Sequence, residues 1–266
     1  MFLADCHVHS FYSFDGHDAP EQLAEAAACR GVAALAITDH CDLSPAGCCP
    51  RYLAIEDRCQ AHIRALAAES AGPEILYGLE LGQPQQNPAE ARALLGRHEY
   101  DFVIGSVHTL SDGRDIYRTN YTDLALCQEV LSRYFADIQQ LLDFGDFDCL
   151  GHLDYPLRAM GDFRPDPSLR EYREQIAPIL KELARQGKGL ELNANGCRKW
   201  IGRPGPDEWV LKTFKDYGGE LLSTGSDAHS SQYCGQGLEQ ALALARSAGF
   251  DQIALFRRRK PELRRF

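Results

Sequence analysis

The sequence predicts an α/β fold, a TIM-like barrel of alternating strands and helices whose metal site lies at the C-terminal ends of the strands. Short apolar runs alternate with amphipathic stretches along the whole chain, which is typical of β/α units around a mostly parallel sheet. Six clusters of His, Asp or Glu accompany these runs, as expected for functional groups at the mouth of a barrel. The chain has 266 residues, 44% of them hydrophobic, and no linker-like segment, so we expect one domain over residues 1–266.

The expected strands are short apolar runs, and several of them end at a polar cluster. Seven precede a final short strand, and the basic residues 257–260 after it are expected to form a solvated edge. The strands cover residues 1–8, 33–37, 75–79, 102–106, 147–151, 189–192, 220–224 and, last, 251–256.

The expected helices fill the gaps between the strands and carry apolar residues at helical spacing. The first begins at Pro20, which suits an initial helical turn, and stops at Gly31. Two loops follow ligand-bearing strands, residues 41–51 and 109–120, and are candidates for the substrate mouth. The helices cover residues 20–30, 55–68, 88–97, 122–144, 169–186, 207–217 and 238–248.

Composition narrows the class of protein. A net charge of −10 argues against a nucleic-acid-binding surface. The ten cysteines lack Cys-x-x-Cys spacing, so we expect reduced thiols in a cytoplasmic protein, with a structural zinc site at Cys41, Cys48, Cys49 and Cys59 as a less favoured alternative. A histidine pair from residue 7 leaves no room for a signal peptide, and no apolar run approaches the ~20 residues of a membrane span, so no membrane partner is expected. Oligomeric state is not predicted.

The polar clusters have the composition of a metal site. His7 and His9 stand one residue apart on a strand, so both imidazoles project from one face and can reach one cation. A single buried histidine is more often a hydrogen-bonded core residue, but the same pattern recurs at His40, His108, His152 and His229. Glu80, in a Gly-Leu-Glu-Leu-Gly turn, is the natural bridge between two ions. The sequence therefore indicates a multinuclear metallohydrolase.

These motifs resemble the PHP (polymerase and histidinol phosphatase) superfamily over nearly the whole chain. The resemblance implies a distorted (β/α)7 barrel with two or three divalent ions, Zn, Fe or Mn, at its mouth. The residues that carry it are Asp5-Cys6-His7-Val8-His9-Ser10, Ser13-Phe14-Asp15-Gly16, Thr38-Asp39-His40, Glu80, Gly105-Ser106-Val107-His108, Gly151-His152 and Gly225-Ser226-Asp227-Ala228-His229.

The resemblance implies a ligand set for each ion. One ion would be held by His7, His9, Glu80 and Asp227, a second by Glu80, His108 and His152, and a third by Asp15, His40 and His229. His17 follows Asp15 by two residues and is an alternative ligand at the third site. Asp5 and Asp39 are expected either to orient the histidines or to be polar strand ends.

Further stretches resemble the histidinol-phosphatase branch: residues 105–110 with 115–117, residues 151–155 with Arg158, and residues 191–198. In relatives, arginines that match Arg158 and Arg198 bind the substrate phosphate, because a guanidinium offers a planar fork of donors to phosphate oxygens. We expect His40 and His229 to contact substrate as well. Asp15, His17 or a metal-bound water would protonate the leaving group.

The expected reaction is phosphomonoester hydrolysis by a metal-bridging hydroxide. The branch implies conversion of L-histidinol phosphate to L-histidinol and phosphate, a step of histidine biosynthesis, with Asp42, Asp112 or Asp115 facing the leaving group. One alternative is a PHP phosphoesterase that acts on another phosphomonoester or a nucleotide. A second alternative is an inactive metal-binding module.

Overall fold

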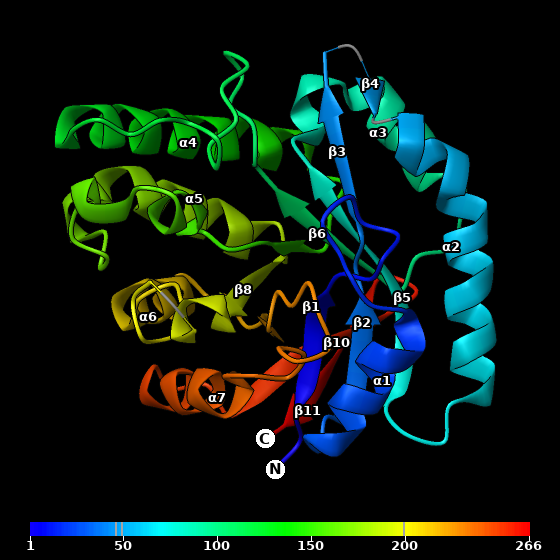
Figure 1. The fold of residues 1–266 in the computed structure, drawn as a ribbon. Coiled ribbons are helices and arrows are strands. Elements are labelled where there is room, and N and C mark those ends of the chain that lie inside the picture. The colour runs from blue at the N-terminus through cyan, green and yellow to red at the C-terminus, as the bar shows by residue number, and fades with distance from the viewer. Residues whose placement is uncertain (46, 49, 199) are drawn as a thin grey trace.

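The computed structural model describes residues 1–45, 47–48, 50–198 and 200–266, and in this part of the chain seven parallel strands surround a barrel interior (Figure 1). β9 meets β1 to close the barrel, since Val8 and Ala228 form a parallel bridge and the Thr224 hydroxyl donates to the Ala4 carbonyl at 2.7 Å. The predicted barrel is confirmed. In spatial order the strands are β1 (Ala4–Val8), β2 (Ala34–Ile37), β5 (Glu74–Gly82), β6 (Phe102–Ser106), β7 (Cys149–Leu150), β8 (Gly189–Asn193) and β9 (Leu222–Gly225).

Helices cover the outside of the barrel. Figure 1 shows α4 to α7 stacked along one side and α1 and α2 on the other. The side chains of Asn87, Asp123 and Asp207 cap α3, α4 and α6 by accepting main-chain N–H groups. Within the described ranges, no helix combines the length and apolar character needed to cross a membrane. The helices are α1 (Pro20–Cys29), α2 (Pro50–Glu69), α3 (Pro88–Leu95), α4 (Leu124–Phe144), α5 (Arg173–Arg185), α6 (Glu208–Asp216) and α7 (Leu238–Ser247), with short 3-10 turns η1 (Pro84–Gln86), η2 (Tyr155–Arg158), η3 (Gly161–Phe163), η4 (Arg170–Tyr172) and η5 (Ala194–Cys197).

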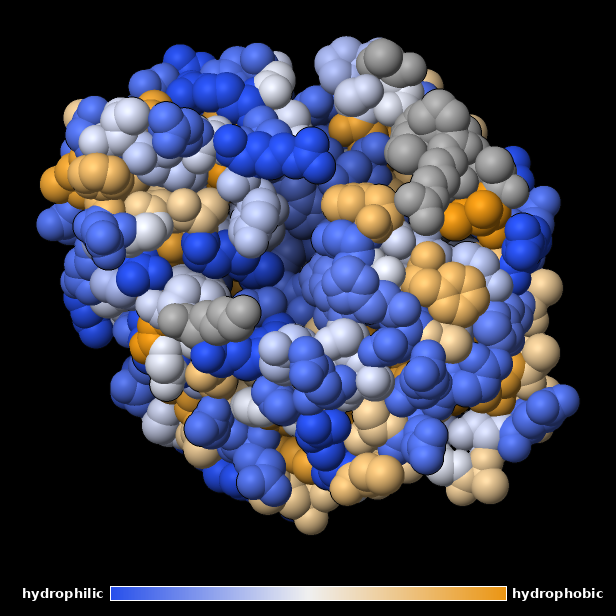
Figure 2. Space-filling view, in the orientation of Figure 1, coloured by the Kyte–Doolittle hydropathy of each residue, from blue (hydrophilic) through white to orange (hydrophobic). Residues whose placement is uncertain are grey.

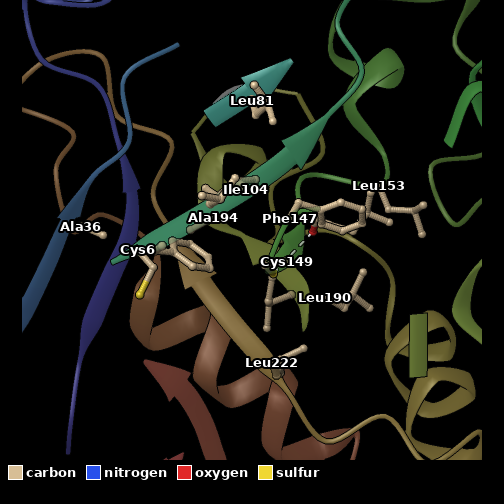
Figure 3. Packing of buried hydrophobic residues seen from close by; sticks show 14 of the residues in the cluster. Cys6, Ala36, Leu81, Ile104, Phe147, Cys149, Leu153, Leu190, Ala194 and Leu222 are labelled. Carbon is tan, nitrogen blue, oxygen red and sulfur yellow. Dashed lines mark hydrogen bonds between the residues drawn. The ribbon is translucent and has the colours of Figure 1, made fainter. Parts of the chain in front are cut away.

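The barrel interior is apolar below the mouth. Figure 3 shows Cys6, Ile104 and Leu222 from three strands among the buried side chains of this layer. Parallel strands that are buried on both faces read as continuous apolar runs, which is why they could be found in the sequence. None of the eight cysteines whose side chains the structure describes forms a disulfide. The side chain of Cys48 and the whole of Cys49 lie outside the described structure, and with them the alternative zinc site.

The prediction of a plain loop over residues 41–51 is wrong for its first part. Here β3 (His40–Ser44) pairs with the end of β5 and with β4 (Gly47–Cys48), while residues 46 and 49 lie outside the described structure. β5 runs to Gly82, beyond its expected end, and thereby offers an edge to β3. The register places His40 opposite Glu80, so the extra strand brings one predicted ligand next to the carboxylate that is predicted to bridge two ions.

The basic segment after the last expected strand is also different from the prediction. β10 (Gln252–Arg257) turns back into β11 (Lys260–Arg265), an antiparallel hairpin that the sequence did not predict, although β11 is exposed at every residue, as expected of a solvated edge. Arg258 and Arg259 occupy its turn with positive φ of 49° and 61°, which non-glycine residues seldom adopt. Contacts at the amino ends of the barrel strands hold this turn, because Arg259 pairs with the buried Asp148 at 3.0 Å.

Candidate metal centre and active site

Glu80 stands at the centre of the predicted ligands. It is fully buried near the end of β5, and its Oε2 lies 3.1 Å from His7 Nε2 and 3.4 Å from His9 Nε2. The same oxygen lies 3.0 Å from Nδ1 of His40. β1 and β3 therefore bring three imidazoles to one carboxylate oxygen on β5, as the parallel arrangement of these strands predicts.

The second oxygen of Glu80 faces the other side of the barrel. Oε1 lies 2.8 Å from His152 Nε2 and 3.1 Å from His108 Nε2, and it accepts a hydrogen bond from the Ser106 hydroxyl at 2.8 Å. The Nε2 atoms of the two histidines are 3.5 Å apart. Glu80 thus joins two groups of imidazoles, which is the arrangement of a bridging ligand.

Asp227 approaches the first group from β9. Its Oδ1 lies 3.5 Å from His9 Nε2 and 3.9 Å from His7 Nε2. Its main chain has a φ of 52°, in the left-handed region, and its N–H donates to the His7 carbonyl at 2.8 Å. A side chain at Gly225 would meet the Cβ of His7 at 2.4 Å, so glycine permits this close approach of β9 to β1.

A third group lies at the rim. His229 Nε2 is 3.2 Å from Asp15 Oδ2, and His40 Nε2 is 3.8 Å from Asp15 Oδ1. The ring of His9 stacks 4.2 Å from the rings of both His40 and His229, which ties this group to the first. His17 is exposed and contributes its main-chain N–H to the His229 carbonyl at 3.0 Å. Its side chain belongs to none of the candidate ligand sets among the described residues.

The donor atoms of these groups fit divalent cations. Several of them are buried without a hydrogen-bond partner among the described residues: His7 Nε2, His9 Nε2, Asp15 Oδ1, His40 Nδ1 and Glu80 Oε2. Buried polar atoms are rarely left unpaired, and imidazole with carboxylate is a donor set that suits zinc, iron and manganese. In each of four sets the ligand atoms lie within 4.8 Å of one another, namely His7/His9/Asp227, His7/Glu80/His152, His40/Glu80/His108 and His9/His40/His229. Eight of the nine predicted ligands therefore form one continuous cluster, and Asp15, which belongs to none of the four sets, lies beside it against His229.

The electrostatics of the cluster favour cations. Burial alone would raise the pKa of Glu80, but His7, His40 and His108 hold it well below its usual range. Burial also opposes ionisation of Asp227, yet Arg158 and then His7 keep the pKa of this carboxyl well below its ordinary value. Two ionised carboxylates thus stand among imidazoles in a buried site.

Glu191 is a functional residue to which the sequence reasoning assigned no role. It is buried on β8, and its Oε1 accepts a hydrogen bond from His7 Nδ1–H at 2.6 Å. Its Oε2 accepts the main-chain N–H of His152 at 2.7 Å. Histidines that bind metals commonly donate their other N–H to a carboxylate, which fixes the ring and its tautomer. The sequence did carry one signal for Glu191, a charged residue within the otherwise apolar run 189–192.

Two further carboxylates support histidines. Asp39 accepts the Ser13 hydroxyl at 3.0 Å, and Ser13 Oγ lies 3.2 Å from His9 Nδ1, so Asp39 acts on His9 through the serine. Asp42 Oδ1 lies 3.0 Å from His108 Nδ1. Asp5 instead holds main chain, because it accepts the N–H of Ser226 at 2.7 Å.

Of the three acids expected near the leaving group, Asp42 is thus the partner of His108. The other two lie in ion pairs of the 109–120 loop. Asp112 contacts Arg114 at 2.8 Å, and Asp115 lies 3.5 Å from Arg118. All three therefore have a protein partner already.

The two predicted phosphate-binding arginines converge on Asp227. Arg158 Nη1 donates to Asp227 Oδ2 at 2.7 Å, while its Nε and Nη2 are buried without a partner among the described residues. Arg198 Nη2 donates to the carbonyls of Ser226 at 2.7 Å and Asp227 at 3.0 Å. Figure 2 shows a hollow with hydrophilic walls on the face where the loop after β1 lies in Figure 1.

Comparison with known proteins gives consistent matches. The model of the PHP domain family matches residues 5–195. A histidinol-phosphatase of Lactococcus lactis subsp. lactis (strain IL1403) is 28% identical over 267 residues, covering 96% of this chain and 95% of the relative. A probable histidinol-phosphatase of Thermotoga maritima is 28% identical over 254 residues and covers 95% of both chains.

Solved structures give the same picture. The crystal structure of histidinol phosphate phosphatase from Lactococcus lactis, complexed with zinc, L-histidinol and phosphate, matches with a TM-score of 0.76 at 26% identity over 98% of both chains. A putative histidinol phosphatase from Listeria monocytogenes shares the fold with a TM-score of 0.73 at 19% identity, covering 89% of this chain and 98% of that one.

Proposed function

Because the chain belongs to the PHP domain family, we propose that it is a metal-dependent phosphomonoesterase that hydrolyses L-histidinol phosphate to L-histidinol and phosphate. The observation that carries the proposal is the fork of Arg158, two buried guanidinium donors for which the described residues provide no acceptor, beside a cluster of imidazoles and carboxylates. The names of the relatives and the ligands of the Lactococcus structure support the substrate. The reaction would then serve histidine biosynthesis.

Nine residues would hold the ions, two or three of Zn, Fe or Mn: His7, His9, Asp15, His40, Glu80, His108, His152, Asp227 and His229. The chemistry that such ions supply when bound is an activated water and neutralisation of phosphate charge. Asp15 lies 3.2 Å from His229, which supports it as the rim ligand in preference to the exposed His17. His40 and His229 belong to the same rim group, where substrate enters.

The arginines would bind the phosphate. Nη1 of Arg158 is held by Asp227, so the edge formed by Nε and Nη2 remains for two phosphate oxygens. A planar fork of this kind suits bidentate contact with phosphate. Arg198 is anchored through Nη2 to two main-chain carbonyls, and its Nε and Nη1 donors, which have no acceptor among the described residues, would face the same anion. Both side chains would neutralise negative charge that develops on the phosphoryl oxygens.

We further infer that residues 1–266 act as one unit. The family model ends at residue 195, whereas Asp227 and His229 follow β9. His7 on β1 lies 3.9 Å from Asp227, so the segment beyond the match completes the same site. A fragment that ends near residue 195 would lack these ligands.

The decisive test is a comparison of kcat/KM for L-histidinol phosphate with that for nucleoside monophosphates and sugar phosphates, measured on metal-replete protein. We expect L-histidinol phosphate to be preferred by at least about tenfold, because discrimination by a built site is worth roughly 1–3 kcal/mol or more. Equal rates across the panel would keep the phosphatase chemistry and remove the substrate assignment. No phosphate release from any member would contradict the proposed function as a whole.

A further inference from the structure

Both arginines that would bind phosphate lie over tyrosine rings. The guanidinium carbon of Arg158 is 4.8 Å from the centre of the Tyr155 ring. That of Arg198 is 4.9 Å from the centre of the Tyr233 ring. An arginine within ~6 Å of an aromatic face gains a cation–π contact. An arginine stacked on a tyrosine ring therefore occurs twice in one candidate site, in two pairs that are far apart in the sequence.

Tyr155 is fixed by more than the arginine. It begins η2, the short 3-10 turn that ends at Arg158. Its ring lies 4.8 Å from the ring of His152 and 5.0 Å from the ring of His108. One aromatic ring thus contacts two predicted metal ligands and one predicted phosphate ligand, which fixes their relative positions.

Tyr233 lies in a turn segment that the main body of the protein holds in place. The N–H of Ser231 donates to Asp18 at 2.6 Å, and the N–H of Gly235 donates to the buried Asp5 at 2.7 Å. These contacts on either side of Tyr233 fix the place of its ring under Arg198. The segment follows His229 directly, so it is continuous with the rim of the candidate site.

Stacking leaves the edge of a guanidinium available. The donors of arginine lie in the guanidinium plane, so an aromatic ring on the face removes none of them. Hydrogen bonds from one nitrogen fix the remaining rotation, through Asp227 for Arg158 and through the carbonyls of Ser226 and Asp227 for Arg198. Each arginine is therefore held by one ring and one anchored nitrogen. Among the described residues this leaves the Nε–Nη2 edge of Arg158 for an anion, whereas Arg198 would offer its Nε and Nη1 donors singly.

We propose that Tyr155 and Tyr233 are positioning residues that set the planes of the two phosphate-binding arginines. The inference rests on the proposed function, since it concerns how the same site receives the phosphoryl group. The rings matter, and the hydroxyls do not. Within the described residues neither hydroxyl has a hydrogen-bond partner in the protein, so phenylalanine should replace tyrosine at both positions.

The test compares Tyr155→Leu with Tyr155→Phe, and Tyr233→Leu with Tyr233→Phe, in metal-replete protein. Each leucine variant should lose roughly 3- to 30-fold in kcat/KM and bind inorganic phosphate, measured directly by titration calorimetry, more weakly by a similar factor. Each phenylalanine variant should stay within about twofold of the native protein. Phe144→Leu is the matched control, because it removes the ring beneath Arg92, 4.9 Å away, outside the site.

A double-mutant cycle separates positioning from general damage. In an Arg158→Ala background, Tyr155→Leu should cost no further activity, because its effect runs through the missing guanidinium. An equal additional loss in that background would overturn the inference for Tyr155, as would a fall in bound metal that accounts for the lost activity.

If Tyr155→Leu does not fold, the Tyr233→Leu and Tyr233→Phe variants still test the proposal. Leucine variants with native phosphate binding, or phenylalanine variants as impaired as leucine, would overturn it. A native protein that hydrolyses no phosphomonoester would refute the proposed function instead, while phosphate binding by the variants would still be measurable.

Discussion

Charged side chains are buried at both ends of the barrel, but the two ends differ in whether these side chains have partners within the protein. At the amino ends of the strands, Asp101 accepts from Arg64 at 2.7 Å, and from the main-chain N–H groups of Tyr77 and Arg258 at 3.1 Å each. Asp148 beside it accepts the Val103 N–H at 2.8 Å and pairs with the turn of the β10–β11 hairpin. Every one of these carboxylates has protein partners.

At the carboxyl ends, donor atoms of histidine and carboxylate converge and several of them have no protein partner within the described ranges. Glu80 and Asp227 are as buried as the aspartates at the other end. Groups left unpaired in a native protein call for a ligand, whereas groups that pair within the chain contribute to stability. Burial of charge alone therefore does not identify a functional site, whereas unpaired histidine and carboxylate atoms that converge within 4.8 Å of one another do.

Replacing the central carboxylate should have the largest effect. Glu80→Gln removes a charged ligand shared by both groups of imidazoles, so we expect kcat/KM to fall roughly 10³-fold or more, about 4 kcal/mol. Metal content, measured in the same preparation, should fall as well. Glu56→Gln is the matched control, because Glu56 is equally buried but bonds to the Tyr100 hydroxyl away from the mouth. If Glu80→Gln kept native activity and metal content, the buried carboxylates at the two ends of the barrel would not differ in function.

Replacing Arg158, which offers a fork of donors to phosphate, should have the next largest effect on kcat/KM. Arg158→Ala should lower kcat/KM about 10- to 150-fold, or ~1.5–3 kcal/mol, because charged hydrogen bonds to phosphate are lost. Arg158→Lys should recover only part of the loss, since an ammonium group cannot present a planar fork. Arg170→Ala, at an exposed ion pair, serves as the control in the same assay. Full activity in Arg158→Lys would show that charge alone matters there.

Glu191 supports two histidines without belonging to the ligand set. Glu191→Gln should weaken metal affinity about 10- to 100-fold, because His7 loses the carboxylate that fixes its ring. Competition with a coloured chelator measures this directly. Glu182→Gln on α5, a half-buried side chain paired with Arg185 on the outside of the barrel, should leave the affinity unchanged. Unaltered affinity in Glu191→Gln would mean that His7 needs no such partner.

The rim group allows a smaller, countable effect. Asp15→Ala should lower bound metal by about one ion while the inner ions remain, because its carboxylate lies against His229. His17→Ala should keep the full complement. Elemental analysis of both variants decides between the two side chains, and the reverse result would give the ligand role to His17.

The amino end should respond through stability, and with a definite pH dependence. Burial, partly offset by Arg259, raises the pKa of Asp148 to about 6. Arg259→Met would raise this pKa further, so ionised Asp148 would be penalised in the folded state as pH rises through that value. We expect Arg259→Met to lower the free energy of unfolding by about 3 kcal/mol at pH 8 and clearly less at pH 5, where Asp148 is protonated.

Urea unfolding of chelator-treated protein at both pH values checks this, since chelation keeps the metal centre out of the comparison. Arg264→Met, which removes an exposed ion pair with Glu262, should cost less than about 0.5 kcal/mol at either pH. A loss in Arg259→Met that does not change with pH would contradict the assignment to Asp148.

The sequence predicted the parts that depend on local pattern. The buried strands appear as apolar runs. The spacing of His7 and His9 alone places both side chains on the same face of a strand. β3 was missed because residues 40–44 include Cys, Asp and Ser, and their strand needs the edge that the extended β5 offers. The contacts of Glu191 and Arg259 depend on strands that become neighbours only in the folded barrel, so no local pattern could assign them.

The most direct test of the central claim measures metal content and turnover in one sample. Native protein should carry about two to three divalent ions per chain, lose phosphate release and thermal stability together on chelation, and recover both when zinc, iron or manganese is restored. The amino end of the barrel, already paired, should contribute nothing to this change. Undiminished turnover in protein shown to be free of metal would contradict the account.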